Sequence, residues 1–397
     1  MTAGINRFMQ QLRTRITRTI RAVRNPGRPR RRQPENEPGL VMIQIDGLSD
    51  AELQRALRQG RLPFMNTLLK KQKYKKHTLY SGLPSSTPAV QGELFYGVRQ
   101  AVPAFCYYDR TAGRIFSMFE GDDVREIRDR IEPGADGLLK NGSAYSDIYG
   151  GGAAEANFCM TQYGWPEIIR NSPPVKLVLL MLLHFISLIR IAVLAGIEFV
   201  LAVFDLFRGL INKKEFRMEL KFVPSRIAVC IIMREVLVVR STMDLARGLP
   251  IVHLNFLGYD EQAHRRGPDS AFAHWTLKGI DHAVKRICSA SRRSPARTYN
   301  VWIYSDHGQI KTVPYRKQTG ESVHTAVSRV FNQTMTTKYD APSGVQFQRA
   351  RMLHPKRHRP ETRPPDRPPI VTALGPLGCV NLGTTCPADK RNVMGCA

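Results

Sequence analysis

Three largely apolar segments constrain the fold of this chain more than any other feature of its sequence. They read LVMIQID at residues 40–46, IVHLNF at 251–256 and YNVWIYSD at 299–306. A largely apolar run of this length is typical of a strand buried on both faces, as in a parallel sheet. Segments with helical periodicity, such as residues 51–71 and 272–290, lie between the runs. We therefore expect an α/β fold with a mostly parallel central sheet and helices on both faces.

The charge of the chain is strongly basic, and much of the excess lies at its two ends. Among 397 residues, Lys and Arg number 59 against 33 Asp and Glu, which gives a formal net charge of +26. Basic ends are typical of chains that approach a polyanion, either nucleic acid or an anionic membrane surface. A basic centre also suits a phosphorylated substrate, and charge alone leaves these alternatives open.

The composition divides the chain into three regions. Residues 1–37 begin with apolar side chains at helical spacing, interleaved with arginines, and end in a Pro- and Arg-rich linker. This pattern predicts a basic amphipathic helix that either lies on a membrane surface or packs on the domain. Residues 38–334 hold the apolar runs and form the expected domain. Residues 335–397 are rich in Arg and Pro, so we expect them to be irregular or truncated relative to a complete domain.

Residues 175–211 form the most hydrophobic segment of the chain. A single crossing of a membrane there would place the strands before and after it on opposite sides of the bilayer. Arg190 interrupts the apolar run, and Glu198 and Asp205 would be costly in hydrocarbon. We interpret the segment as an apolar helical hairpin insertion that dips into or faces a membrane. The alternative is a helical pair buried in the fold or in a dimer.

The cysteines and the N-terminus bear on the compartment. The seven cysteines are widely spaced without a CxxC pair, which argues against a disulfide framework or a zinc finger and for reduced thiols. The N-terminus lacks the apolar core and cleavage site of a secretory signal. We expect a cytoplasmic protein that is peripheral or hairpin-anchored at the inner face of a membrane.

Acidic side chains follow all three apolar runs. Asp46 and Asp306 come at the ends of the first and third runs, and Asp260 comes shortly after the second. Because parallel strands end at one edge of a sheet, where α/β proteins bind ligands, we expect these acids to converge. His307 follows Asp306 directly, and His264 lies on the same helical face as Asp260. Asp and His together suit divalent cations such as zinc or manganese.

A hydroxyl-rich turn, PSSTP at residues 84–88, supplies a further element. We place Thr87 at a strand-to-helix turn, where such a sequence is often no more than a turn with a helix N-cap. Beside a metal site the same hydroxyl gains a second role. A bound cation lowers the pKa of a coordinated alcohol, so Thr87 becomes a candidate nucleophile.

These motifs occur in an order that resembles the alkaline phosphatase superfamily. Asp46 after a strand, Thr87 at the head of a helix, DxxxHxxGP from Asp260 and SDHG at residues 305–308 are closest to the type I phosphodiesterase/nucleotide pyrophosphatase family. The resemblance covers about residues 40–330 and implies an alkaline-phosphatase-like catalytic domain. It also implies a hydrolase that cleaves phosphodiester or nucleotide pyrophosphate bonds.

The resemblance implies a role for each matching residue. One metal ion would be held by Asp46, Asp306 and His307 and would contact and activate the nucleophile Thr87. A second would be held by Asp260, His264 and a histidine late in the chain. Both ions are expected to be Zn2+, with Mn2+ as the alternative.

The late histidine is where this sequence departs from the family pattern. Cys379 stands in the motif GPLGC, where related sequences are expected to have the histidine, and is our candidate for the last ligand. Three histidines are the alternatives: His324, His354 and His358. If none of these residues completes the second metal site, the protein would be weakly active or inactive.

The expected partners are a phosphorylated small molecule, a nucleotide or a lipid head group, together with an anionic membrane surface. Nucleic acid is a less favoured partner, and no feature indicates the oligomeric state. Two other functions remain open. One is a membrane-associated phosphomonoesterase or phosphotransferase of the same superfamily, and the other is a catalytically incomplete fragment that binds polyanions through its Arg-rich ends.

Overall fold

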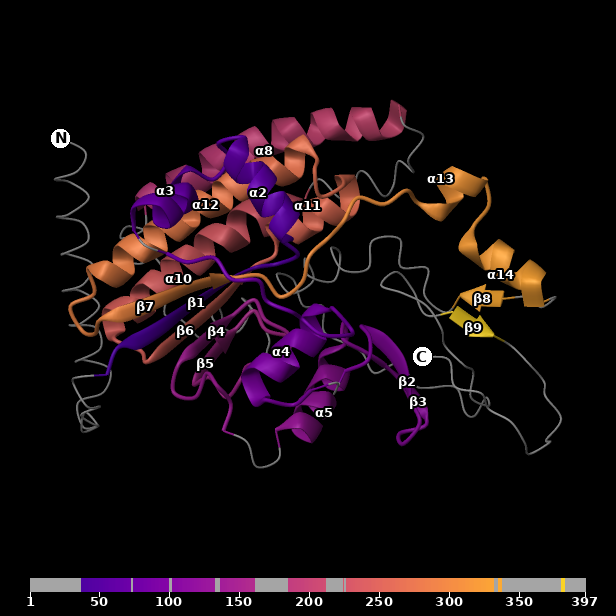
Figure 1. The fold of residues 1–397 in the computed structure, drawn as a ribbon, viewed down its shortest axis with the longest axis horizontal. Coiled ribbons are helices and arrows are strands. Elements are labelled where there is room, and N and C mark those ends of the chain that lie inside the picture. The colour runs from indigo at the N-terminus through magenta and orange to yellow at the C-terminus, as the bar shows by residue number, and fades with distance from the viewer. Residues whose placement is uncertain are drawn as a thin grey trace.

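A five-stranded parallel sheet forms the centre of the computed structural model (Figure 1). The structure describes residues 37–72, 74–99, 102–132, 136–160, 185–211, 224, 226–331, 335–337 and 380–382. The sheet has the order β5-β4-β6-β1-β7, and all its neighbouring strands pair in parallel. The strands are β1 (Gly39–Ile45), β4 (Ser143–Tyr145), β5 (Glu155–Asn157), β6 (Ile251–Phe256) and β7 (Tyr299–Tyr304). The expected parallel α/β sheet is confirmed.

The central strand β1 shows why the apolar runs form strands. Val41, Ile43 and Ile45 alternate toward one face of the sheet and belong to a buried apolar cluster with helices on that side. Gln44 faces the opposite side, where it meets a polar side chain of a covering helix. Because both faces are covered, β1 carries no exposed position, and Leu40 is its one half-buried residue.

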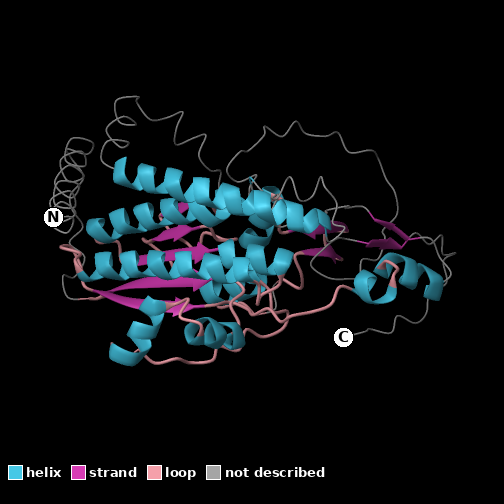
Figure 2. Cartoon of the chain, turned by 90° about the horizontal axis from the view of Figure 1, so that it is seen from above, coloured by secondary structure: helices cyan, strands magenta, loops and turns pink. Residues whose placement is uncertain are grey.

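Helices cover both faces of the sheet (Figures 1 and 2). On one face lie α2 (Asp50–Arg58), α3 (Pro63–Lys71), α10 (Arg234–Arg247), α11 (Gly258–Arg266) and α12 (Ala271–Arg292). On the other lie α4 (Thr87–Tyr96) and α5 (Gly121–Ile131), which share a second apolar cluster with β4. A π-helical turn, η1 (Ala228–Met233), leads into α10. Seen from above, the long helices run roughly along the strands (Figure 2).

Smaller elements lie outside this layered core. The strands β2 (Cys106–Asp109) and β3 (Arg114–Ser117) form an antiparallel pair. After the sheet come two helices, α13 (Tyr315–Thr319) and α14 (Val323–Phe331). The strands β8 (Met335–Thr337) and β9 (Val380–Leu382) pair antiparallel. The described residues do not include the basic helix and linker predicted before residue 37. After residue 334, they include only β8 and β9.

The helical segment predicted over residues 51–71 is divided into two helices. Ser49 caps α2, because its side chain accepts a hydrogen bond from the amide of Glu52. The chain then turns at Gly60, whose φ is +67°, a conformation that favours glycine. Pro63 starts α3 at a position where its missing N–H costs nothing. The sequence therefore contained two signals for the break between α2 and α3, namely Gly60 and Pro63.

The apolar segment around residue 200 forms one continuous helix, α8 (Phe185–Ile211). It runs through position 190 without a break, so Arg190, which interrupts the apolar run in the sequence, does not interrupt the helix. Residues 175–184, which would form part of the predicted hairpin, lie outside the described residues. Within the described part of the chain, no helix combines the length and the apolar character needed to cross a membrane.

A buried ion pair holds α8 against the helical layer. Glu198 pairs with Arg226, and both side chains are fully buried. The indole Nε1 of Trp275 on α12 donates to the second oxygen of Glu198 at 3.3 Å, and the Arg226 guanidinium lies 4.4 Å from the centre of the Phe272 ring. Glu198 is therefore buried in the protein and has its own partners. From the sequence we had considered only that its charge would be costly in the hydrocarbon of a membrane.

The cysteine expectation is partly wrong. Cys159, Cys230 and Cys288 are free and buried. Burial raises the pKa of Cys230 to about 12 and that of Cys288 to about 11, so both thiols stay protonated at neutral pH. Cys106, in contrast, is disulfide-bonded.

Removing one partner of the buried pair should destabilise the protein strongly. We expect Arg226→Met to lower the free energy of unfolding by about 3–5 kcal/mol, because Glu198 then stays buried without its cation. The matched control is Arg329→Met, which breaks the exposed pair with Glu321 and should cost at most about 1 kcal/mol. Urea denaturation measures both, and equal small losses would show that the buried pair does not hold α8.

Candidate metal centre

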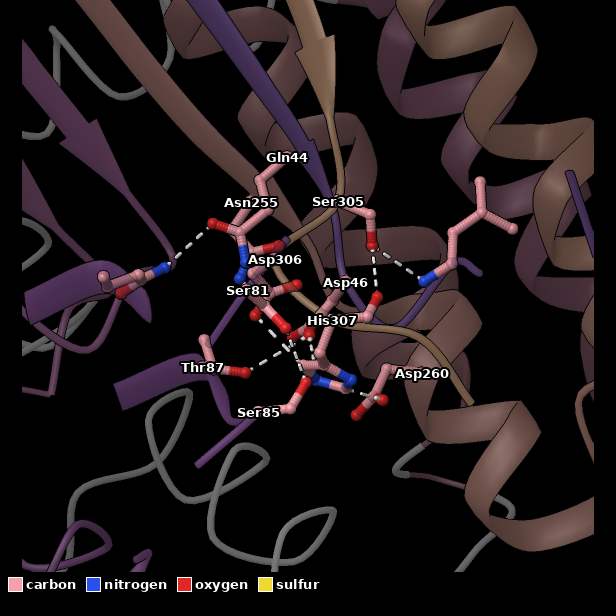
Figure 3. Close-up of polar contacts among 12 residues, drawn as sticks. Gln44, Asp46, Ser81, Ser85, Thr87, Asn255, Asp260, Ser305, Asp306 and His307 are labelled. Carbon is pink, nitrogen blue, oxygen red and sulfur yellow. Dashed lines mark hydrogen bonds and ion pairs between the residues drawn. The ribbon is translucent and has the colours of Figure 1, made fainter. Parts of the chain in front are cut away.

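Three buried carboxylates converge at the carboxyl edge of the sheet (Figure 3). Asp46 directly follows β1, Asp306 lies two residues after β7, and Asp260 lies in the first turn of α11. All three side chains are buried. The parallel pairing of β1 with both β6 and β7 brings these residues to one edge, as the sequence predicted.

His307 joins two of these acids in a group that could hold a metal ion. Ligand atoms of Asp46, Asp260 and His307 all lie within 4.8 Å of one another. His307 Nε2 is 3.2 Å from Asp46 Oδ1 and 3.9 Å from Asp260 Oδ1. Two carboxylates and an imidazole are a donor set that suits a divalent cation of the zinc or manganese type. In the part of the chain that the structure describes, this is the group with metal-ligand geometry.

Asp306 fits the same interpretation. Neither of its oxygens has a hydrogen-bond partner of normal geometry, although the Thr87 hydroxyl lies near enough to lower its pKa somewhat. Burial and the neighbouring Asp46 carboxylate outweigh this effect and raise the pKa of Asp306 to about 7. A buried carboxylate without hydrogen-bond donors is costly in a folded protein. A cation would remove that cost, so the residue fits a metal ligand.

The protonation of His307 reflects the same excess of negative charge. Burial alone lowers the pKa of His307. Its hydrogen bond to Asp46 and the charges of the acids around it act in the opposite direction and raise that pKa to about 10. The imidazolium proton thus offsets part of the carboxylate charge. A divalent cation would take over this role and displace the proton, since metal ligands bind in their deprotonated form.

His264 and Asp260 face the same way, as their spacing predicted. His264 Nε2 lies 3.4 Å from Asp260 Oδ1, and the histidine is 41% exposed. Gln309 also reaches this acid, because its Nε2 donates to Asp260 Oδ1 at 2.5 Å. Sequence reasoning missed Gln309, although it lies one residue after the SDHG motif.

Gly47 makes room for Asp260 beside Asp46. Its φ is +72°, and a Cβ placed on it would lie 2.4 Å from Asp260 Oδ1. Any side chain here would therefore both strain the backbone and displace the acid. Glycine at this position is a requirement of the site.

Ser305 ties together the loops that follow β1 and β7. The amide of Leu48 donates to Ser305 Oγ at 2.9 Å, and Ser305 Oγ donates to the carbonyl of His307 at 2.7 Å (Figure 3). These bonds fix the relative positions of the two loops that carry Asp46 and His307. No pattern in the sequence indicates this role of Ser305.

Thr87 is the hydroxyl that faces the carboxylates. It is the first residue of α4, it is buried, and its Oγ1 donates to Asp46 Oδ1 at 3.3 Å. The neighbouring Ser85 is bonded to Ser81, and Ser86 has no hydrogen-bond partner for its hydroxyl. Residues 74–86 contain no strand, so the expected strand-to-helix turn is a loop that leads into a helix.

A buried amide locks α4 onto the sheet one turn below Thr87. Gln91 Nε2 donates to Gln44 Oε1 at 3.0 Å and to Asp147 Oδ1 at 2.9 Å. Its Oε1 accepts from the amide of Ile148 at 2.8 Å. Because Gln44 lies two residues before Asp46 on β1, these bonds fix the separation between Thr87 and Asp46.

The same polar network extends across three strands. His253 on β6 pairs with Asp147 at 2.8 Å and bonds to the Tyr304 hydroxyl at 2.6 Å. Tyr304 in turn donates to Gln44 at 3.2 Å. His253 is therefore a hydrogen-bonded core residue. Asn255, two residues further on β6, donates to Asp46 Oδ2 at 3.4 Å.

The last ligand of the second metal site stays a prediction. Cys379, His354 and His358 lie outside the described residues, and β9 begins just after Cys379. His324 lies within α14, but its side chain is not described. Asp260 and His264 are thus the two predicted ligands of this site that the structure places together.

No protein-family model matches the chain, and no curated protein sequence matches it. The geometry of the site therefore carries the functional assignment.

Substitution of Gly47 should weaken metal binding selectively. We expect Gly47→Ala to lower the affinity for Mn2+ or Zn2+ by about 10–100-fold, because the new Cβ displaces Asp260. Gly60→Ala is the matched control: Gly60 also has a positive φ, yet a Cβ there meets nothing within 4 Å. Isothermal titration calorimetry measures both variants. Equal affinities in the two would show that Asp260 does not bind the ion.

Metal ions should also stabilise the folded protein. At a free concentration about 100 times Kd, a bound ion adds about 2.7 kcal/mol to the free energy of unfolding. We therefore expect Zn2+ or Mn2+ to raise the Tm of the wild type in differential scanning calorimetry. Asp260→Asn should remove most of this shift. A shift of the same size in both proteins would place the ion elsewhere.

Proposed function

We propose that the protein is a metal-dependent phosphohydrolase with an alkaline-phosphatase-like fold. In this proposal it cleaves phosphodiester or nucleotide pyrophosphate bonds, and Thr87 is the nucleophile. One observation carries the proposal: the Thr87 hydroxyl lies 3.3 Å from an oxygen of Asp46, which belongs to the group Asp46, Asp260 and His307. A buried hydroxyl beside a cluster of metal-ligand type is the arrangement that nucleophilic phosphoryl transfer needs.

The residues present fit a two-metal site. Asp46, Asp306 and His307 would hold one ion, and Asp260 and His264 would hold the second with a further ligand, for which Cys379 is the candidate. We expect Zn2+, with Mn2+ as the alternative. When bound, the ions would neutralise charge on the phosphoryl oxygens and lower the pKa of the Thr87 hydroxyl. The lack of a hydrogen-bond partner of normal geometry at both oxygens of Asp306 supports the presence of a cation at this position.

The proposed reaction has two displacement steps at phosphorus. In the first, Thr87 Oγ1 loses its proton and forms a bond to phosphorus while the bond to the leaving oxygen breaks. The leaving oxygen takes up a proton and departs, and a phosphothreonine ester remains. In the second, a water oxygen forms a bond to the same phosphorus and the bond to Thr87 Oγ1 breaks. The hydroxyl regains its proton, and a phosphomonoester is released. Both steps place negative charge beside the N-terminus of α4, where the helix dipole favours an anion.

The chain positions Thr87 rigidly for this attack. Gln91 holds α4 against β1 and against Asp147, one turn from the nucleophile. Asp46 accepts the hydroxyl hydrogen bond and so orients Oγ1 toward the cluster. Fixing reacting groups in this way removes orientational entropy from the barrier.

Substitution of Thr87 should separate catalysis from metal binding. We expect Thr87→Ala to lower the turnover of an aryl phosphodiester by at least about 10³-fold, as loss of a nucleophile does in other enzymes. The affinity for Mn2+ should change little, because the acids and histidines remain. Thr87→Ser keeps a hydroxyl and should retain measurable activity.

The matched control is Thr67→Ala on α3, where the hydroxyl bonds only to the Pro63 carbonyl at an exposed position. It should have wild-type turnover. Undiminished turnover in Thr87→Ala would contradict the nucleophile assignment. A preference of the wild type for the matching monoester would favour the phosphomonoesterase alternative, and no turnover with any metal would favour the incomplete fragment.

A further inference from the structure

The outer face of α8 carries an apolar stripe that is exposed on the protein. Its members follow one another at spacings of three and four residues and are 43–72% exposed; they are Ile189, Val193, Ile197, Val200, Phe204 and Phe207. We call this set the α8 stripe. Phe199 lies beside it and is also exposed. None of the exposed side chains that the structure describes on α8 is charged. A helix that faces water normally carries polar side chains on its outer face.

The opposite face of α8 is fixed to the protein. Glu198 is buried in its pair with Arg226 and its bond to Trp275, and Ala202, one turn further, is also buried. Figure 1 shows α8 at the outside of the helical layer, on the side away from the sheet. The stripe is therefore held outward by contacts on the inner side of the helix.

A row of basic side chains is exposed on α12, which contacts α8 through Trp275. Lys278, His282 and Lys285 are exposed on α12, and the row begins one turn after Trp275, which bonds to α8. Lys278 Nζ lies 5.8 Å from the centre of the Trp275 ring. The one acid in this stretch of α12, Asp281, is buried and bonded to backbone amides of α3. The surface therefore combines apolar and cationic side chains with an indole at their boundary.

We propose that the α8 stripe docks on an anionic lipid surface, with α8 lying in the plane of the interface. The isoleucine, valine and phenylalanine side chains would enter the boundary between head groups and acyl chains, while Lys278 and Lys285 meet the phosphates. Trp275 is of the type enriched at this boundary. A second copy of the chain fits this surface less well than an anionic lipid does. It would bring the same basic side chains of α12 and no exposed acid of that helix to pair with them. The proposal is independent of the hydrolase activity.

Flotation of the full chain with vesicles tests the proposal. The probes are phosphatidylcholine vesicles with and without about 30% phosphatidylserine, at about 0.1 M salt. We expect the wild type to float with the anionic vesicles. Phe204→Asp should lower the partition coefficient at least about tenfold, because it puts a charge at the centre of the apolar contact. Lys278→Glu with Lys285→Glu should also weaken binding to the anionic vesicles.

Val330→Asp is the matched control, since Val330 is 76% exposed on the distant helix α14. It should float as the wild type does. Thermal melts followed by circular dichroism verify that every variant is folded. The proposal is overturned if the wild type does not float, or if Phe204→Asp floats as well as the wild type.

A second measurement separates α8 from the basic helix that the sequence predicts before residue 25. Brominated lipids should quench the tryptophan fluorescence of Phe204→Trp much more than that of the wild type. The fluorescence of Val330→Trp should show no such increase in quenching. Binding without quenching at position 204 would show that another segment contacts the lipid, which overturns the proposal. Light scattering could instead find that the wild type is a dimer and that Phe204→Asp is a monomer. That result would show that the α8 stripe binds a second copy of the chain.

Discussion

The repulsion among three buried carboxylates is the constraint on which the site depends. Asp46, Asp260 and Asp306 lie together away from water, and ions taken out of water cost several kcal/mol each. The chain offsets only part of this cost, through a raised pKa at Asp306 and an imidazolium at His307. A divalent cation would offset the rest. The surrounding structure serves this arrangement, from the parallel strands that bring the acids together to the glycine that lets two of them meet.

The two faces of the sheet contribute differently to the proposed function. One face is packed with apolar side chains from β1, α10 and α12, which gives the strand ends a rigid base. The other holds a buried polar network in which Gln91 joins α4 to β1 and Asp147. Satisfied networks of this kind fix one geometry, because each member would lose its partners if it moved. Thr87 is thus positioned by hydrogen bonds, and the residues of the candidate metal group are positioned by the core.

The sequence predicted the parts of the molecule that follow from periodicity and strand order. Largely apolar runs identified β1, β6 and β7. The rule that parallel strands end together predicted that Asp46, Asp260 and Asp306 lie in one place. It did not predict Gln309, Ser305 or Gln91. Their roles depend on how loops and helices approach one another, which no local pattern encodes. The partner of Glu198 was hidden for the same reason, because Arg226 lies beyond the apolar segment in which the acid was found.

Anomalous diffraction from crystals soaked in Mn2+ or Zn2+ tests the central claim most directly, because it locates each bound ion without reference to activity. The account predicts a peak bounded by Asp46, Asp260 and His307, within coordination distance of Asp306. A second peak beside His264 would identify the second ion, and the side chain that completes its coordination would reveal the missing ligand. Peaks confined to exposed histidines, with none at the carboxylates, would contradict the account.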